Sequence, residues 1–185
     1  MTSQTNNTRY TSTAISLHWL IAIAIFANLT LGFYVSDLPF SPQRIRLISY
    51  HKWMGVTIFL FAVIRVFWRL THKPPSLPDT IPRWQQMASA AAHGFLYLLL
   101  VIVPLSGWLY SSAAGVPVMY FGIIRLPDLI GADKTLADNL KELHELLNFM
   151  LIAVVILHVL AALKHHFVDR DEILSRMLPF LKSRS

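Results

Sequence analysis

Two histidines, His144 and His158, lie fourteen residues apart in a segment that is otherwise almost wholly apolar. In an α-helix, fourteen steps of about 100° come within roughly 40° of four full turns, so both imidazoles lie on one helix face. They are separated along the helix axis by about 21 Å, most of the hydrocarbon thickness of a bilayer. Histidine inside a membrane helix is costly and usually marks a functional site. A helix with one histidine near each membrane surface is typical of half of a two-haem ladder.

Three further histidines fall at the same two depths, which we call the outer and the inner level. His51 is expected at the outer level with His144, and His18 and His93 at the inner level with His158. The outer pair has no rival, so if haem is present His51 and His144 are its axial ligands. The inner level has one histidine too many. His158 shares a face with His144, which favours the pair His18 and His158 and leaves a pair that includes His93 open.

Two basic residues have the positions expected for partners of haem propionates. Arg65 lies fourteen residues after His51, hence on the same face at the inner level. An intramembrane arginine needs an anionic partner, and a propionate is a good candidate, whereas extension to the headgroups is the alternative. Lys52 has the same possible role for the outer haem. A lone intramembrane histidine is also compatible with hydrogen-bonded packing, and for His93 this interpretation is at least as good as ligation.

The composition limits which cofactors the chain can hold. It contains no cysteine, which excludes covalently attached haem, thiolate-bound iron–sulfur clusters and disulfides, and leaves histidine as the strongest metal ligand. His72, His165 and His166 fall at the inner membrane boundary, where a position in water or among lipid headgroups is expected.

The elements that position these residues are four apolar stretches. Of 185 residues, 55% are hydrophobic and 14% charged, whereas a soluble domain carries about 25% charge. The stretches lie near residues 14–35, 49–70, 87–110 and 143–164, and each meets the length of about 20 residues needed to span a bilayer. We therefore predict an all-α fold, an integral membrane four-helix bundle with two b haems in its core. Residues 1–185 would form this single membrane domain, with no separate soluble domain.

The distribution of Lys and Arg predicts the orientation of the bundle. Ten of these residues lie at the N-terminus, in the connection between the second and third stretches and in the C-terminal tail, against six on the other side. This bias puts both termini in the cytoplasm. The net charge of +6 is thus explained by membrane topology rather than by nucleic-acid binding. In the long connection from Ser111 to about Leu136, residues 118–124 are apolar but too short to span, and are expected across the outer face, where they could roof a cofactor.

Short motifs surround the histidines along nearly the whole chain. They are Arg9-Tyr10, Leu17-His18-Trp19-Leu20, His51-Lys52-Trp53-Met54-Gly55, Arg65-Val66-Phe67-Trp68-Arg69-Leu70, Ala92-His93, Pro104-Leu105-Ser106-Gly107, His144-Glu145, His158, His165-His166-Phe167 and Arg176-Met177-Leu178-Pro179. Together this set resembles the bacterial di-haem cytochrome b561 family. The resemblance implies a multi-pass protein of the bacterial inner membrane with two non-covalent b haems. Carried over by position, it implies that His18 and His158 hold one haem and that His51 and His144 hold the other.

The resemblance and the residues together leave three functional hypotheses. One branch of the family oxidises superoxide and passes the electrons to ubiquinone, so the first hypothesis is a superoxide:ubiquinone oxidoreductase. Two imidazoles saturate each iron, which leaves only electron transfer at the haem edge. The outer face offers cations that could steer an anion, partly cancelled by acids. The cations are Arg44, Arg46, Lys52 and Arg125, and the acids are Asp37, Asp128, Asp133 and Asp138.

The second hypothesis is an electron-carrier cytochrome b subunit that links quinone to a partner dehydrogenase or reductase. The third belongs to another class, a metal or ion transporter with histidines along its path, and would favour carboxylates within the helices, which are absent here. The expected partners are membrane lipid, quinone, and superoxide or a redox protein, with no nucleic acid.

Overall fold

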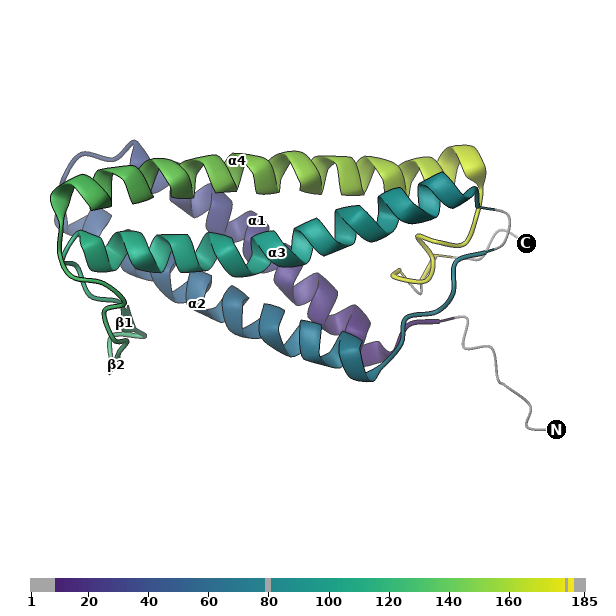
Figure 1. Cartoon of the computed structure of the whole chain (residues 1–185), viewed down its shortest axis with the longest axis horizontal. Helices are drawn as coiled ribbons and strands as arrows, with labels where there is room; N and C mark the ends of the chain where they lie inside the picture. The colour runs from purple at the N-terminus through teal and green to yellow at the C-terminus, as the bar shows by residue number, and fades with distance from the viewer. Residues whose placement is uncertain (1–8, 79–80, 179, 182–185) are drawn as a thin grey trace.

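The computed structural model describes residues 9–78, 81–178 and 180–181, and within them the fold is a bundle of four long helices (Figure 1). The helices are α1 (Ser12–Ser36), α2 (Pro42–Thr71), α3 (Arg83–Ala113) and α4 (Lys134–Lys164). Each is long and apolar enough to cross a membrane. Each predicted apolar stretch lies inside one of these helices. The predicted domain of residues 1–185 also includes ends that lie outside the described residues.

Side-chain caps fix where three of the helices begin. The side-chain oxygens of Thr11, Ser41 and Asp133 accept hydrogen bonds from backbone N–H groups in the first turns of α1, α2 and α4. Pro42 follows Ser41 at the first helical position, where its missing N–H costs nothing. As a result α2 and α4 begin several residues before the apolar stretches.

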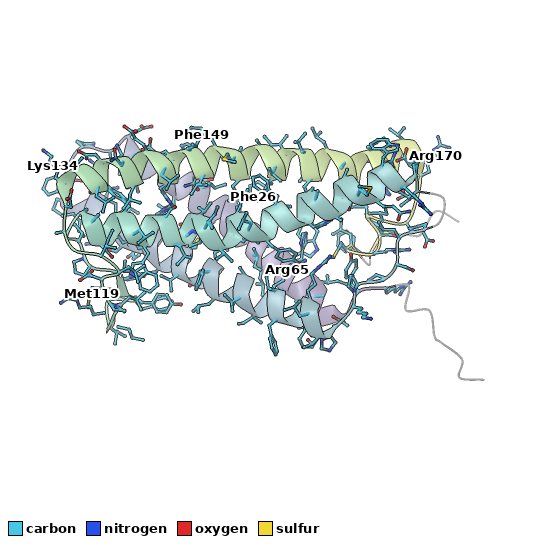
Figure 2. All side chains as sticks on the ribbon, in the orientation of Figure 1. Phe26, Arg65, Met119, Lys134, Phe149 and Arg170 are labelled. Atoms are coloured by element: carbon cyan, nitrogen blue, oxygen red, sulfur yellow. The ribbon has the colours of Figure 1, made fainter. Side chains whose placement is uncertain are left out.

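The bundle has an apolar outer surface. Phe67, Phe149 and Leu157 are 66%, 59% and 65% exposed, and Figure 2 shows Phe149 on the outer side of α4. The buried core is one cluster between the helices. Its members are Ile21, Ile25, Ile58, Ala62, Leu99, Leu100, Val103 and Leu151. A surface of large apolar side chains on helices of this length is that of a membrane protein whose helices face lipid.

The connection between α3 and α4 forms a small hairpin beside α2. Strands β1 (Met119–Tyr120) and β2 (Ile124–Arg125) pair antiparallel at the outer end of the bundle (Figure 1). The indole N–H of Trp53 donates to the Met119 carbonyl, and the Tyr120 hydroxyl lies 3.0 Å from the Thr57 hydroxyl. The hairpin therefore lies against the middle of α2, at Trp53 and Thr57. None of residues 118–124 lines the outer histidine cavity described below.

The segment after α4 turns back under the inner end of the bundle. A π-helical turn, η1 (His165–Asp169), is followed by Arg170 in the left-handed region at φ 55°. The chain then reverses, and the Trp19 indole donates to the Met177 carbonyl at 2.9 Å. The Arg176 guanidinium donates to the Ser76 carbonyl at 2.7 Å, which ties this tail to the connection after α2. The tail therefore lies next to His18, the neighbour of Trp19 in the chain.

Candidate metal centres

The outer level brings together His51 of α2 and His144 of α4. Their ring centroids lie 6.3 Å apart, with the ring planes at 86° to each other. A metal–imidazole bond is about 2.0 Å long and the ligating nitrogen lies about 1 Å from the ring centre, so two imidazoles on opposite sides of one metal ion have centroids about 6 Å apart. The pair thus has the separation that one iron between two axial histidines requires.

Hydrogen bonds at Nδ1 leave the other nitrogen of each outer histidine free. His51 Nδ1 lies 3.2 Å from the Asn28 carbonyl, and His144 Nδ1 lies 3.1 Å from the Val103 carbonyl and 2.8 Å from the Ser106 hydroxyl. A carbonyl oxygen can only accept, so Nδ1 carries the proton and Nε2 presents its lone pair. Metal-binding histidines are typically held in this way, which fixes the ring orientation and the tautomer.

Two glycines provide the space in which the outer rings lie. A Cβ atom at Gly32 would lie 3.0 Å from Cε1 of His51, and a Cβ at Gly107 would lie 3.0 Å from Cε1 of His144. Both distances are shorter than an ordinary contact of about 3.5 Å. Gly32 in α1 and Gly107 in α3 therefore let these helices approach the two histidines closely.

A cavity of about 580 Å³, partly open to the surroundings, lies at the outer level. Both outer histidines, Lys52, Gly55 and the side chains of Asn28 and Asn148 line it, with apolar residues around them. Oδ1 of Asn28 is buried without a hydrogen-bond partner. A buried polar atom without a partner is costly, and here it indicates a site built for a bound group.

At the inner level His158 of α4 lies between two candidate partners. Its ring centroid is 6.2 Å from that of His18 and 5.2 Å from that of His93. The first distance matches the separation of about 6 Å for one metal between two imidazoles, and the second is about 1 Å too short. Nδ1 of His93 lies 2.7 Å from the Ser89 carbonyl one turn earlier in its own helix. The distances favour His18 over His93.

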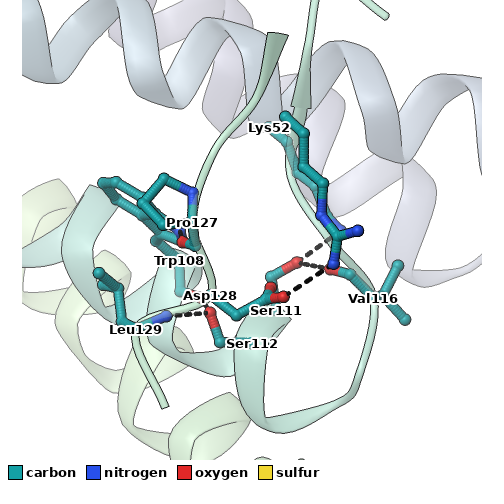
Figure 3. Close-up of polar contacts among 9 residues, drawn as sticks. Lys52, Trp108, Ser111, Ser112, Val116, Pro127, Asp128 and Leu129 are labelled. Atoms are coloured by element: carbon teal, nitrogen blue, oxygen red, sulfur yellow. Dashed lines mark hydrogen bonds and ion pairs between the residues drawn. The ribbon is translucent and has the colours of Figure 1, made fainter. Parts of the chain in front are cut away.

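The two predicted propionate partners lie at the expected levels. Arg65 donates to the Ala14 carbonyl at 2.7 Å and lies 3.4 Å from Nδ1 of His18. Lys52 lines the outer cavity, and its ammonium donates to the Ser111 hydroxyl at 2.6 Å (Figure 3). Each basic residue is therefore next to one histidine pair.

The boundary histidines have other neighbours. His72 stacks on Trp68 at a centroid distance of 3.8 Å. His165 Nδ1 lies 2.6 Å from a carboxylate oxygen of Asp171 and 3.2 Å from one of Asp169. These contacts are those of residues at the ends of helices, and neither histidine has a ring contact with a histidine of the inner level among the described contacts.

Sequence reasoning did not consider Asn28 or Gly32, and it gave Ser106 and Gly107 only as parts of a motif, without a contact to His144. Asn28 carried a usable signal, because an amide in an otherwise apolar membrane helix is costly and faces the interior. The roles of the two glycines depend on contacts between helices, which spacing within one helix does not reveal.

Comparison with known proteins gives consistent matches over almost the whole chain. The family described as "Prokaryotic cytochrome b561" matches residues 9–180. The protein named cytochrome b561 homolog 2 of Escherichia coli (strain K12) is 35% identical over 178 residues, covering 92% of this chain and 91% of that protein. The probable superoxide oxidase CybB of Yersinia pestis is 31% identical over 179 residues, covering 92% and 96%. Cytochrome b561 homolog 1 of E. coli is 27% identical over 177 residues, covering 92% and 97%.

Proposed function

Because this chain belongs to the prokaryotic cytochrome b561 family, electron-transfer proteins of the bacterial inner membrane that bind b haem, we propose that it holds two haems and passes electrons from superoxide to ubiquinone. The observation that carries the proposal is the pair of histidine separations, 6.3 Å at the outer level and 6.2 Å at the inner level. Each separation suits two axial imidazoles on one iron. When bound, the haems supply one-electron transfer at potentials that the protein sets.

His51 and His144 hold the outer haem in this proposal, and His18 and His158 hold the inner one. Two imidazoles for each haem would leave its iron no free position for binding oxygen. Superoxide therefore gives up its electron by outer-sphere transfer, for which it needs only to approach the edge of the outer site. Buried apolar residues between the helices, among them Ile58, Leu99 and Leu151, exclude water from the interior.

Arg65 pairs with a propionate of the inner haem. The apoprotein contact between Arg65 and Nδ1 of His18 requires Nδ1 to accept, because a guanidinium only donates. Ligation through Nε2 instead requires the proton on Nδ1, so the two arrangements exclude each other. If His18 held a haem through Nε2, Arg65 would lose its contact with Nδ1 of His18 and would be available to pair with a propionate.

Lys52 is the cation best placed to attract an anion to the outer site. Of the four outer cations predicted from the sequence, Arg125 is paired with Asp128 at 3.2 Å. Lys52 lies at the outer cavity itself and donates to Ser111 and to the Val116 carbonyl. In this proposal the Lys52 ammonium attracts superoxide and can also pair with a propionate of the outer haem.

The overall reaction balances as follows. Two superoxide ions each lose one electron and leave as dioxygen, and one ubiquinone takes up two electrons and two protons to become ubiquinol. The electron donor determines the direction of electron flow, because two haems held by these four histidines could pass electrons in either direction. An electron-carrier subunit would therefore use the same four ligands with a different donor.

Stopped-flow mixing of the oxidised, reconstituted protein with superoxide tests the proposal. The haem content should be two per chain, and superoxide should reduce the haem at a rate limited by encounter, followed by reoxidation on addition of ubiquinone. A His51→Ala variant, which lacks an outer ligand, is the control and should react much more slowly. If ubiquinol reduces the wild-type haem quickly while superoxide reduces it slowly, the carrier-subunit function replaces this one.

A further inference from the structure

A second cavity, distinct from the histidine levels, lies at the inner end of the bundle. It lies between the start of α1, the end of α2 and Tyr97 of α3, is partly open to the surroundings, and has an empty volume of about 440 Å³. We call it the inner basic pocket because five basic residues line it and, within the part of the chain that the structure describes, no Asp or Glu does. The basic residues are Arg9, Arg65, Arg69, His72 and Lys73.

The inner basic pocket is not the inner histidine site. None of His18, His93 and His158 is among the residues that line it. Arg65 is the one basic residue shared between the two regions, and its guanidinium is turned towards Ala14 and His18. Arg69 lies about one turn beyond Arg65 near the end of α2, and Lys73 follows two residues after the helix ends at Thr71.

Specific contacts build the walls of this pocket. The Trp68 indole donates to the Thr11 hydroxyl at 3.0 Å, and the same hydroxyl caps α1 by accepting from the Ala14 N–H at 3.2 Å. The His72 ring stacks on the same Trp68 indole, at an interplanar angle of 4°. The start of α1 is thereby fixed against the end of α2, so the cations are held around a formed cavity.

The cations of the pocket are close together, and the described residues that line it include no acid. The guanidinium carbons of Arg65 and Arg69 lie 6.0 and 5.6 Å from the centre of the same Tyr97 ring. Two like charges on one ring repel each other, and an anion between the end of α2 and the start of α1 would relieve that repulsion. Large apolar side chains of α2 beside the pocket, Phe67 and Leu70, are 66% and 78% exposed.

We propose that the inner basic pocket binds the phosphate of an anionic phospholipid, held by Arg69, Lys73 and Arg9. The pocket lies where a membrane-spanning helix reaches the headgroup level, and basic pockets between membrane helices on the cytoplasmic side bind anionic headgroups. The exposed Phe67 and Leu70 give the acyl chains an apolar surface on the same helix. The planar guanidinium of Arg and the ammonium of Lys both donate hydrogen bonds to phosphate oxygens.

Native mass spectrometry of the haem-loaded protein, exchanged into nanodiscs of phosphatidylglycerol or of phosphatidylcholine, tests this site. The wild type should retain phosphatidylglycerol preferentially. Arg69→Gln/Lys73→Gln should lose about 30-fold of that preference, since each cation near the surface contributes about 1 kcal/mol. Arg83→Gln, which removes an exposed cation at the start of α3 outside the pocket, should retain it.

Two further measurements identify the anion. Inorganic phosphate at millimolar concentration should not displace the lipid, because a free ion lacks the apolar contacts. The visible spectrum and haem content of Arg69→Gln/Lys73→Gln should match those of the wild type, and Arg69→Lys/Lys73→Arg should restore retention. Equal lipid retention in the double Gln variant and in Arg83→Gln overturns the proposal. Haem loss in the double variant with unchanged lipid retention also overturns it and assigns the pocket to a propionate.

Discussion

One added methyl group at Gly107 is expected to weaken binding of the outer haem by displacing His144. An alanine Cβ at this position would lie 3.0 Å from Cε1 and 3.3 Å from Nδ1 of the His144 ring. An ordinary contact is about 3.5 Å, so the ring would have to move back by about 0.5 Å. Metal–ligand distances vary by only about 0.2 Å, so the iron–nitrogen bond cannot absorb this movement.

The size and sign of the effect follow from the packing. Overpacking a well-packed site costs about 1–3 kcal/mol, equivalent to about 5- to 150-fold weaker haem retention. Helix propensity acts in the opposite direction, because alanine is favoured over glycine in a helix interior by about 1 kcal/mol. Loss of haem from Gly107→Ala would therefore be steric. Gly32→Ala should have the same effect on the same haem, because its Cβ would meet Cε1 of His51 at 3.0 Å.

Gly94→Ala is the matched control, since it makes the same change in the same helix, α3, where nothing lies within 4 Å of the added atom. Each variant would be purified with limiting haem, and the haem content per chain measured as the pyridine haemochrome. Gly107→Ala and Gly32→Ala should each approach one haem per chain, and Gly94→Ala should keep two. Full haem content and unshifted potentials in both test variants would refute the steric argument and the outer ligand pair with it.

Three further predictions concern the other proposed residues. His158→Ala should remove the inner haem and His93→Ala should retain it, as measured by haem content per chain. The reason is that the ring of His93 is about 1 Å too close to His158 to share one iron with it. The opposite result would make His93 a ligand. Arg65→Met should lower the potential of the inner haem by about 60 mV or more, the equivalent of a tenfold change for one electron, since a nearby positive charge disfavours the oxidised form; an unchanged redox titration would contradict the propionate pairing. Lys52→Gln should slow the reaction with superoxide severalfold at low salt and flatten its dependence on ionic strength, because exposed charges act over only about 10 Å at 0.1 M salt; an unchanged salt dependence would exclude Lys52 from steering.

The sequence predicted the family, the four-helix membrane bundle and the inner-membrane location, and the comparisons confirm all three. It misplaced the outer ends of two helices. α2 begins at Pro42 and α4 at Lys134, whereas the apolar stretches begin near residues 49 and 143. Hydropathy detects only the part of a helix that lies in lipid, and the caps Ser41 and Asp133 were the remaining signals.

The histidines were predictable to different extents. The fourteen-residue spacing placed His144 and His158 on one face, because helical periodicity acts within a single segment. The choice between His18 and His93 depends on how α1 and α3 are rotated against α4, and spacing contains no information about that rotation. Haem ligation by these residues stays a prediction that the variants above test.

The position of the histidines on α4 has a consequence for how the protein is made. In the proposed ligand set this last helix supplies one axial ligand to each haem, His144 at one level and His158 at the other. A ribosome adding about 5–20 residues per second needs roughly 5–20 s to reach His144 after His51 has emerged. During that interval the nascent bundle has only one proposed axial ligand of each haem, and neither ligand pair is complete until translation is almost finished. A chain that terminates before α4 would lack both His144 and His158, so neither proposed haem site would have its second ligand, and cofactor retention would distinguish full-length chains from truncated ones.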